Sequence, residues 1–382
     1  MGRPGSDDND FSLGIEEEYL LVDVESGQLA TDPPRDLMLA CSRELGRRVS
    51  PELMQSQIEV GTDVCQTAGD ARRQLVELRK TIAEITGHYG LAPIAASTHP
   101  FARWLEQKQT DKERYVELTR EMQGAARRLL ICGMHVHVGI AEPELRIDVM
   151  NQLSYFLPHM LALSCSSPFW EGANTGLKCY RLTVFDGLPR TGLPPQFSSF
   201  AEYERQMGLL QSTGVIADGS SIWWDLRPSV RFPTVETRIM DVCTSLDHAV
   251  SLAALTQCLV RFLFRTRHGN MRWRVYDNSL ISENRWRAMR YGIDEGMIDF
   301  GKSQITRFPE LLEELIEMLS DDAQALGCLD ALTGLRQIMV QGTSAHQQLH
   351  MYGRSLSAGD TREEALRKVV AWLVDETTGS CT

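Results

Sequence analysis

The sequence predicts an α+β fold, in which a mainly antiparallel sheet is covered by helices on one face. Two observations lead to this class. Four short segments alternate apolar and polar residues with the period of a β-strand, and longer segments place apolar residues at helical spacing. The two kinds of segment do not follow one another as a regular βαβ series, which disfavours a parallel sheet. The 382 residues contain no internal repeat and no low-complexity linker.

Each predicted strand sorts its side chains onto two faces, because successive side chains of a strand point in opposite directions. The four strands span residues 14–23, 55–62, 133–140 and 234–240. One face of each is apolar and suits packing against helices. The other faces carry carboxylates, imidazoles and an arginine: Glu16, Glu18, Glu59, His135, His137, Glu236 and Arg238. These polar faces predict one wall of a cavity.

A single strand of this kind is more often a solvated surface strand than part of a site. The same pattern in four strands of one chain favours a shared site instead. Glu17 is the exception, because it falls on the apolar face of the first strand. We expect it either to be exposed near the sheet edge or to mark a bulge that shifts the register.

The predicted helices lie between and after the strands. Apolar residues recur at helical spacing in residues 70–88, 143–163 and 246–264, and Pro309 suits the first turn of another helix. From about Ser282 onward the pattern is almost wholly helical. Residues 177–195 are rich in Pro and Gly, so we expect a strand followed by a long loop there.

Composition is typical of an enzyme from a reducing compartment. Hydrophobic residues make up 43% of the chain, enough for one large domain over residues 11–376 after a polar, disordered tail at 1–10. The formal net charge of −12 argues against nucleic-acid and anionic-membrane partners. Nine cysteines are scattered singly without a CxxC, and no run of eighteen apolar residues predicts a membrane span. We therefore expect a cytoplasmic protein.

Carboxylates with some imidazole are the ligands that hard divalent cations such as Mg²⁺ or Mn²⁺ prefer. The polar wall therefore predicts a metal-dependent enzyme. The chain has neither a Gly-x-x-x-x-Gly-Lys-Ser/Thr phosphate loop nor a Gly-x-Gly-x-x-Gly after a strand. Any nucleotide would have to be bound by the wall itself and by nearby arginines.

Six blocks of sequence occur in order across nearly the whole chain: GIEEEYLLVD, MQSQIEVGT, STHPFARW, GMHVHVGI, SSPFWEGANTG and ENRWRAMRYG. They resemble the type 2 glutamate–cysteine ligase family, and specifically its bacterial carboxylate–amine ligase branch. The paired glutamates of the first strand, GMHVH and VETR are more distantly similar to strands of glutamine synthetase. The resemblance implies a glutamine-synthetase-like catalytic fold. In that fold a curved antiparallel sheet forms a funnel for metal and nucleotide, with helices on its outer face.

The resemblance implies an ATP- and Mg²⁺-dependent (or Mn²⁺-dependent) carboxylate–amine ligase. Its reaction would join glutamate to an amine such as cysteine through a γ-glutamyl phosphate. Its partners would be these small molecules, and a homodimer is left open. Another phosphoryl-transfer enzyme, such as a guanidino or carboxylate kinase, and a non-catalytic metal–nucleotide sensor are the alternatives. The complete set of wall residues argues against the sensor, since a decayed site should lose ligands first.

The resemblance also implies a role for each site residue. A cation nearest the transferred phosphate would be held by Glu16, His135 and Glu236. A second cation, nearer the amino-acid substrate, would be held by Glu18, Glu52 and Glu59. Arg238 would bind the substrate α-carboxylate, because a guanidinium holds a carboxylate bidentately. Together with the metal ligands Glu16 and Glu236 it forms the expected catalytic set. The residues expected at the nucleotide are His137, Arg181, Arg227, Arg231, Asn284 and Arg290.

Overall fold

The computed structural model describes residues 11–379, so the tail expected at 1–10 lies outside the described residues. Its first third contains β1 (Leu13–Asp23), α1 (Arg35–Leu45), β2 (Val49–Pro51), β3 (Gln57–Gly61), α2 (Ala68–Gly87), β4 (Leu91–Ile94), α3 (Glu113–Met122) and α4 (Gly124–Arg127). The middle contains β5 (Met134–Gly139), α5 (Pro143–Leu153), α6 (Leu157–Ser164), β6 (Phe169–Trp170), β7 (Ala173–Asn174), α7 (Arg181–Phe185), β8 (Thr191–Gly192), α8 (Phe200–Ser212), β9 (Trp223–Trp224), β10 (Leu226–Pro228) and β11 (Thr234–Thr237). The last part contains α9 (Leu246–His268), α10 (Asn278–Tyr291), β12 (Met297–Asp299), β13 (Gln304–Thr306), α11 (Phe308–Ala325), α12 (Leu329–Gln341), α13 (Ser344–Ser357) and α14 (Arg362–Gly379).

The main sheet has seven strands in the order β10-β11-β5-β1-β3-β2, with β4 paired to the far end of β1. Every pairing in it is antiparallel. The long strand β1 is central because it pairs with β5, β3 and β4 along its length. The predicted α+β class with a mainly antiparallel sheet is therefore confirmed, and the four predicted strands are β1, β3, β5 and β11.

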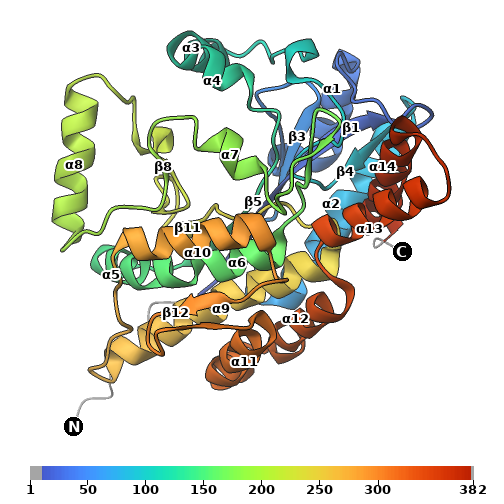
Figure 1. Ribbon diagram of the computed structural model, residues 1–382. Coiled ribbons are helices and arrows are strands. Elements are labelled where there is room, and N and C mark those ends of the chain that lie inside the picture. Colours follow the sequence, from blue (N-terminus) through green and yellow to red (C-terminus); the bar gives the residue numbers. More distant parts are fainter. Residues whose placement is uncertain (1–10, 380–382) are drawn as a thin grey trace.

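Helices α2, α5, α9 and α14 pack on one face of this sheet, as the amphipathic patterns predict (Figure 1). The buried face of α2 carries Leu75, Leu78 and Ile82, three of the residues that share its helical stripe. Helix α9 runs beneath β1 and β5. By length and composition it is the one helix of residues 11–379 that could cross a membrane, but 78% of that window is buried inside the fold. Helix α9 is therefore a central helix of the core.

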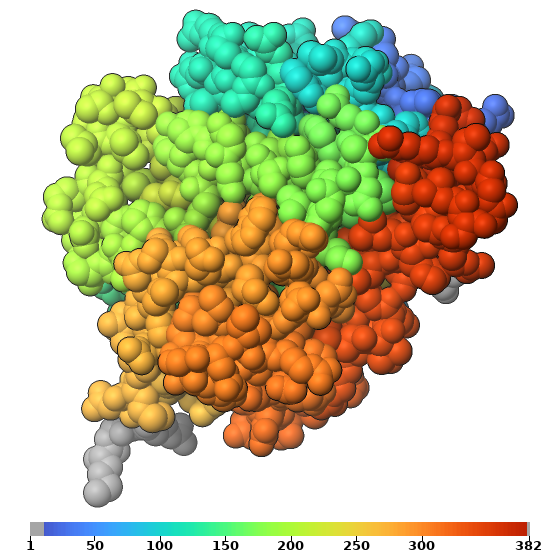
Figure 2. Space-filling model, viewed as in Figure 1, coloured from blue at the N-terminus to red at the C-terminus, as the bar shows by residue number. Residues whose placement is uncertain are grey.

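One continuous cluster of buried apolar side chains extends from Phe11 to Leu373. Figure 2 shows the C-terminal residues, orange to red, packed directly against the green middle of the chain without a separate lobe. One domain over residues 11–376 stays a prediction.

Two element predictions need correction. The strand expected in residues 177–195 is instead the short helix α7 and a turn, because the Ser167 hydroxyl accepts the backbone N–H groups of Tyr180 and Arg181 and starts a helical turn. The helix expected over 143–163 is divided into α5 and α6 by a 3₁₀ turn at 154–156. The helical pattern after Ser282 is confirmed apart from the β12–β13 hairpin.

Both expectations for Glu17 are wrong. Its side chain is fully buried on the helix-facing side of β1, and the β1–β3 register continues through it without a bulge. The charge is matched by Arg79 of α2, whose Nη2 lies 2.6 Å from Glu17 Oε1 and whose Nε donates to Oε2 at 2.9 Å. The Tyr19 hydroxyl donates to the same carboxylate. A buried, fully paired carboxylate thus fastens β1 to α2.

Candidate active site

A cavity of about 410 Å³ opens on the sheet face opposite the helices. Its walls come from β1, β3, β5 and β11, from α3 and α7, and from the loops around β2 and β10. Eleven predicted site residues line it: Glu16, Glu18, Glu52, Glu59, His135, His137, Arg181, Arg227, Arg231, Glu236 and Arg238. The strand alternation therefore locates the wall correctly.

The strand register explains why these side chains converge. Glu16 of β1 lies opposite His135 of β5, and His137 of β5 lies opposite Glu236 of β11. On the other side of β1, Glu18 lies opposite Glu59 of β3. Directly opposed residues in an antiparallel pair project from the same face, so two neighbouring groups of ligands form across four strands.

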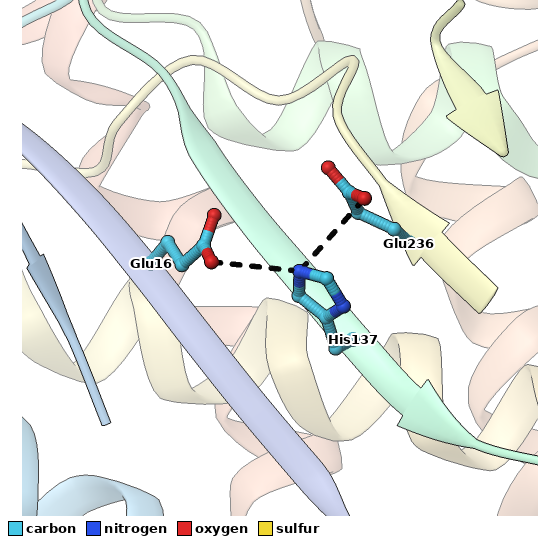
Figure 3. Close-up of side chains that lie close together, drawn as sticks. All are labelled: Glu16, His137 and Glu236. Carbon is cyan, nitrogen blue, oxygen red and sulfur yellow. Dashed lines mark ion pairs between the residues drawn. The ribbon is translucent and has the colours of Figure 1, made fainter. Parts of the chain in front are cut away.

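The first group consists of Glu16, His137 and Glu236, whose side chains point toward one another in Figure 3. His137 Nε2 lies 3.7 Å from Glu16 Oε1 and 4.0 Å from Glu236 Oε2. That nitrogen is buried and has no hydrogen-bond partner among the described residues, whereas Nδ1 lies 2.9 Å from Thr234 Oγ1. An imidazole nitrogen left unpaired between two carboxylates fits a divalent cation.

His135 differs from its expected place in this first group. Its Nδ1 lies 3.1 Å from Glu16 Oε2 and its Nε2 lies 3.9 Å from Glu18 Oε1. The side chain therefore bridges the two groups of ligands, and His137 completes the first group instead. The two histidines share one face of β5, so the sequence pattern alone could not distinguish their roles.

The carboxylates of the first group are ionised. Burial raises the pKa of Glu16, but the hydrogen bond and charge of His135 and then the charge of His137 outweigh it and lower the pKa to about 2. Burial likewise opposes ionisation of Glu236, but the charges of Arg238 and Arg227 hold its pKa well below the usual range. These residues present negative charge without needing a cation to do so.

The second group consists of Glu18, Glu52 and Glu59, with carboxylate oxygens within 4.8 Å of one another. Glu18 Oε2 accepts the Gly133 backbone N–H at 2.7 Å, and Ser50 Oγ donates to Glu59 at 3.1 Å. Burial and the charge of Glu18 raise the pKa of Glu52 to about 7. Burial and the charge of Glu52 raise the pKa of Glu59 well above its usual range. Such crowded carboxylates also fit a divalent cation, which would relieve their repulsion.

Two of the expected phosphate-binding arginines are engaged elsewhere. Arg227 donates to both oxygens of Glu236 at 3.0 and 3.1 Å and to the carbonyls of Ser220 and Ile222. Arg181 is buried, and its two terminal nitrogens donate to the carbonyls of Ile239 and Arg238. Both arginines line the cavity, but their donors hold Glu236 and the chain after β11 in place.

Arg238 and Arg231 also line the cavity. Arg238 Nη1 donates to Glu236 and lies 3.4 Å from His135 Nδ1, whereas its Nε is buried and has no partner within the described part of the chain. Arg231 lies at the cavity rim beside Phe232, whose ring packs edge-on against His137 at 6.1 Å.

Asn284 and Arg290 do not line the cavity. The Asn284 amide exchanges hydrogen bonds with the backbone of Ile298 at 2.8 and 2.9 Å, which fixes the β12–β13 hairpin to α10. Arg290 is exposed and donates to the carbonyl of Gly176. The expectation that these two residues contact the nucleotide is therefore not supported by their positions.

Sequence reasoning missed the side of the cavity formed by α3. Lys112, Arg114 and Tyr115 line it together with the apolar residues Leu118 and Leu129. Charged residues on a polar helix indicate a solvated surface, so no local signal marks them as part of a site.

Known proteins resemble this chain over nearly its whole length. The model of the family described as glutamate-cysteine ligase family 2 (GCS2) matches residues 12–371. A Jannaschia protein named "Putative glutamate–cysteine ligase 2" is 55% identical over 376 residues, which cover 98% of this chain and 99% of that protein. A Rhodospirillum rubrum protein of the same name is 54% identical over 371 residues, with coverage of 96% and 95%.

Two solved structures share the fold at low sequence identity. The bifunctional glutathione synthetase from Pasteurella multocida has a TM-score of 0.69 at 14% identity, over 97% of this chain and 52% of that one. The glutamate–cysteine ligase from Francisella tularensis, solved in complex with AMP, has a TM-score of 0.66 at 14% identity, over 97% and 93% of the two chains. At this identity the likeness is one of fold.

Proposed function

Because the chain belongs to glutamate–cysteine ligase family 2, we propose that it joins the γ-carboxylate of glutamate to the amino group of cysteine with hydrolysis of ATP. The observation that carries this function is the pair of adjacent ligand groups on the polar face of one sheet. Glu16, His137 and Glu236 would hold one Mg²⁺ or Mn²⁺, and Glu18, Glu52 and Glu59 another. When bound, these cations supply positive charge beside the phosphates and the carboxylate that reacts.

The proposed reaction has two steps, in which Arg238 and Arg227 have different roles. Attack of a glutamate γ-carboxylate oxygen on the γ-phosphorus of ATP forms γ-glutamyl phosphate and releases ADP. The amine then attacks the acyl carbon, loses a proton and expels inorganic phosphate. Arg238 would fix the α-carboxylate of glutamate, since it lines the cavity next to Glu236. Arg227 keeps Glu236 in position during both steps.

The nucleotide would lie over the first ligand group. Arg231 supplies a cation at that end of the cavity, and Phe232 is 54% exposed beside it and offers an apolar surface. This placement leaves the second ligand group to the amino-acid substrates.

The test is product formation from ATP, Mg²⁺, glutamate and cysteine, followed by mass spectrometry and ADP release. We expect γ-glutamylcysteine from the wild type. Glu16→Gln and Glu236→Gln should each lower kcat by at least about a hundredfold, the scale of lost electrostatic stabilisation in a transition state. Glu25→Gln, on an exposed turn, is the matched control. A phosphorylated small molecule as the end product, without an amide, would favour the kinase alternative instead.

A further inference from the structure

We propose that Arg114, assisted by Lys112, binds the carboxylate of the amine acceptor and so selects an α-amino acid over a plain amine. This inference rests on the proposed function and concerns the side of the same cavity that α3 forms.

The basic side chains that line the cavity differ in what they already contact. Arg227 and Arg238 are paired with Glu236, and Arg181 donates to backbone carbonyls. Among the described residues, the lining cations whose side chains have neither a carboxylate nor a carbonyl partner are Lys112, Arg114 and Arg231. Arg231 lies at the end proposed for the nucleotide. Lys112 and Arg114 therefore remain as the cations that can meet an anionic substrate at the other end.

Hydrogen bonds fix Lys112 and Arg114 beside the second ligand group. Thr110 donates its backbone N–H to the Leu53 carbonyl at 2.9 Å, and its hydroxyl donates to the Glu52 carbonyl at 2.5 Å. The buried Tyr115 hydroxyl donates to the Pro51 carbonyl at 3.0 Å. The segment that carries the two cations is thus tied to the segment that carries Glu52.

An α-amino acid carries its carboxylate on the carbon that bears the attacking amine. A cation next to the second ligand group can therefore bind that carboxylate while the amine faces the acyl phosphate. A guanidinium holds a carboxylate bidentately, which fixes orientation as well as charge. Apolar side chains lie beside the cations and suit a short side chain such as that of cysteine: Leu53, Leu118, Leu129 and Ile131. Glutamate already has Arg238 for its own α-carboxylate.

Cysteine and cysteamine test the inference, because they share the amine and the thiol and differ only in the carboxylate. With ATP, Mg²⁺ and glutamate held constant, Arg114→Gln should lower kcat/KM for cysteine by about ten- to hundredfold, the range for one hydrogen bond to a charged group. The kcat/KM for cysteamine should change less than about twofold. Arg114→Lys should recover part of the preference for cysteine. Arg120→Gln, on the same helix but outside the cavity lining, should behave as the wild type.

A second assay separates this inference from the proposed function. Hydroxylamine attacks an acyl phosphate and gives a hydroxamate and phosphate, so it reports γ-glutamyl phosphate without any acceptor. Arg114→Gln should form γ-glutamyl hydroxamate at the wild-type rate, which also shows that the variant is folded. Equal losses with cysteine and cysteamine would overturn the inference alone. Absence of hydroxamate from the wild type would remove the proposed function and this inference with it.

Discussion

At the scale of single residues, the pair Glu17 and Arg79 shows how a charge can serve the fold beside a site without belonging to it. Both side chains are fully buried, and Arg79 also donates to the carbonyls of Cys243 and Thr244. Removing one partner of such a pair leaves the other charge buried and unpaired. Because the chain from Cys243 follows the strand that carries Glu236, this pair links two strands of the site from behind.

We therefore expect Glu17→Gln to lower the free energy of unfolding by about 3–5 kcal/mol, the usual cost of breaking a buried ion pair. Chemical denaturation at neutral pH measures the change. Glu25→Gln, exposed on the turn after β1, should stay within about 0.5 kcal/mol of the wild type. A small loss for Glu17→Gln would mean that the ion pair with Arg79 contributes little to stability.

Arg238 and Arg227 both donate to Glu236, yet only Arg238 keeps a buried donor unpaired. Arg238→Lys retains the charge but loses the second edge of the guanidinium. We expect the KM for glutamate to rise at least about tenfold while the KM for ATP stays within about twofold. Arg227→Lys, the matched control, should instead lower kcat through misplacement of Glu236. If Arg238→Lys weakens ATP and spares glutamate, the orientation of substrates in the cavity must be reversed.

The sequence could place a site residue where its position depends on neighbouring residues, but not where it depends on contacts that are distant in the chain. Glu16, Glu18, Glu59, His135, His137 and Glu236 followed from strand alternation, which requires only neighbours in the chain. The partner of Glu17 lies 62 residues away, and Glu52 lies past the end of β2, so no alternation could place either. Asn284 was expected at the nucleotide, but its side chain is directed to the β12–β13 hairpin. The sequence alone does not show that α10 packs against this hairpin.

At the scale of elements, the segment between α4 and β5 shows why one glycine is required. A Cβ at Gly133 would lie 2.4 Å from Arg181 Nη2, and the Gly133 N–H donates to Glu18. Strand β5 therefore begins just after Gly133, where the buried Arg181 side chain of α7 lies so close to the backbone that no side chain fits. The sequence shows the strand but not the arginine, since α7 was expected to be extended.

Gly133→Ala should accordingly displace either Arg181 or the strand. We expect destabilisation of about 1–3 kcal/mol, the usual range for overpacking, together with weaker cation binding at the second ligand group. Calorimetric unfolding and Mn²⁺ titration measure the two effects. Gly124→Ala is a suitable control, because a Cβ there meets no atom within 4 Å. Equal behaviour of both variants would mean that Arg181 can move aside without cost.

At the scale of the whole molecule, cation binding and folding are linked through the second ligand group. Its three carboxylates come from β1, from β3 and from the residue after β2, so they meet only in the folded chain. The eight cysteines of residues 11–379 are all buried and unpaired, so the described chain contains no disulfide to fix this arrangement instead. Packing, the Gly133 N–H and the Ser50 hydroxyl hold these carboxylates together against their mutual repulsion.

The pH dependence of this linkage has a definite sign. Between the usual carboxyl pKa of about 4.3 and the raised pKa of Glu52, about 7, the folded protein binds more protons than the unfolded chain. In that window the cation-free protein should lose stability as pH rises. A divalent cation needs the ionised carboxylates and displaces the proton, so its affinity should increase as the pH rises through about 7, where Glu52 titrates.

We therefore expect Mg²⁺ or Mn²⁺ to raise the melting temperature more at pH 8 than at pH 6. A free cation concentration of a hundred times Kd adds about 2.7 kcal/mol to the free energy of unfolding. Differential scanning calorimetry at both pH values, with and without the cation, measures the difference. Glu52→Gln has no proton to release at this position, so its cation effect should differ less between the two pH values than that of the wild type. An equal increase at pH 6 and pH 8 for the wild type would show that the cations bind only at the first ligand group, whose carboxylates are ionised throughout this range.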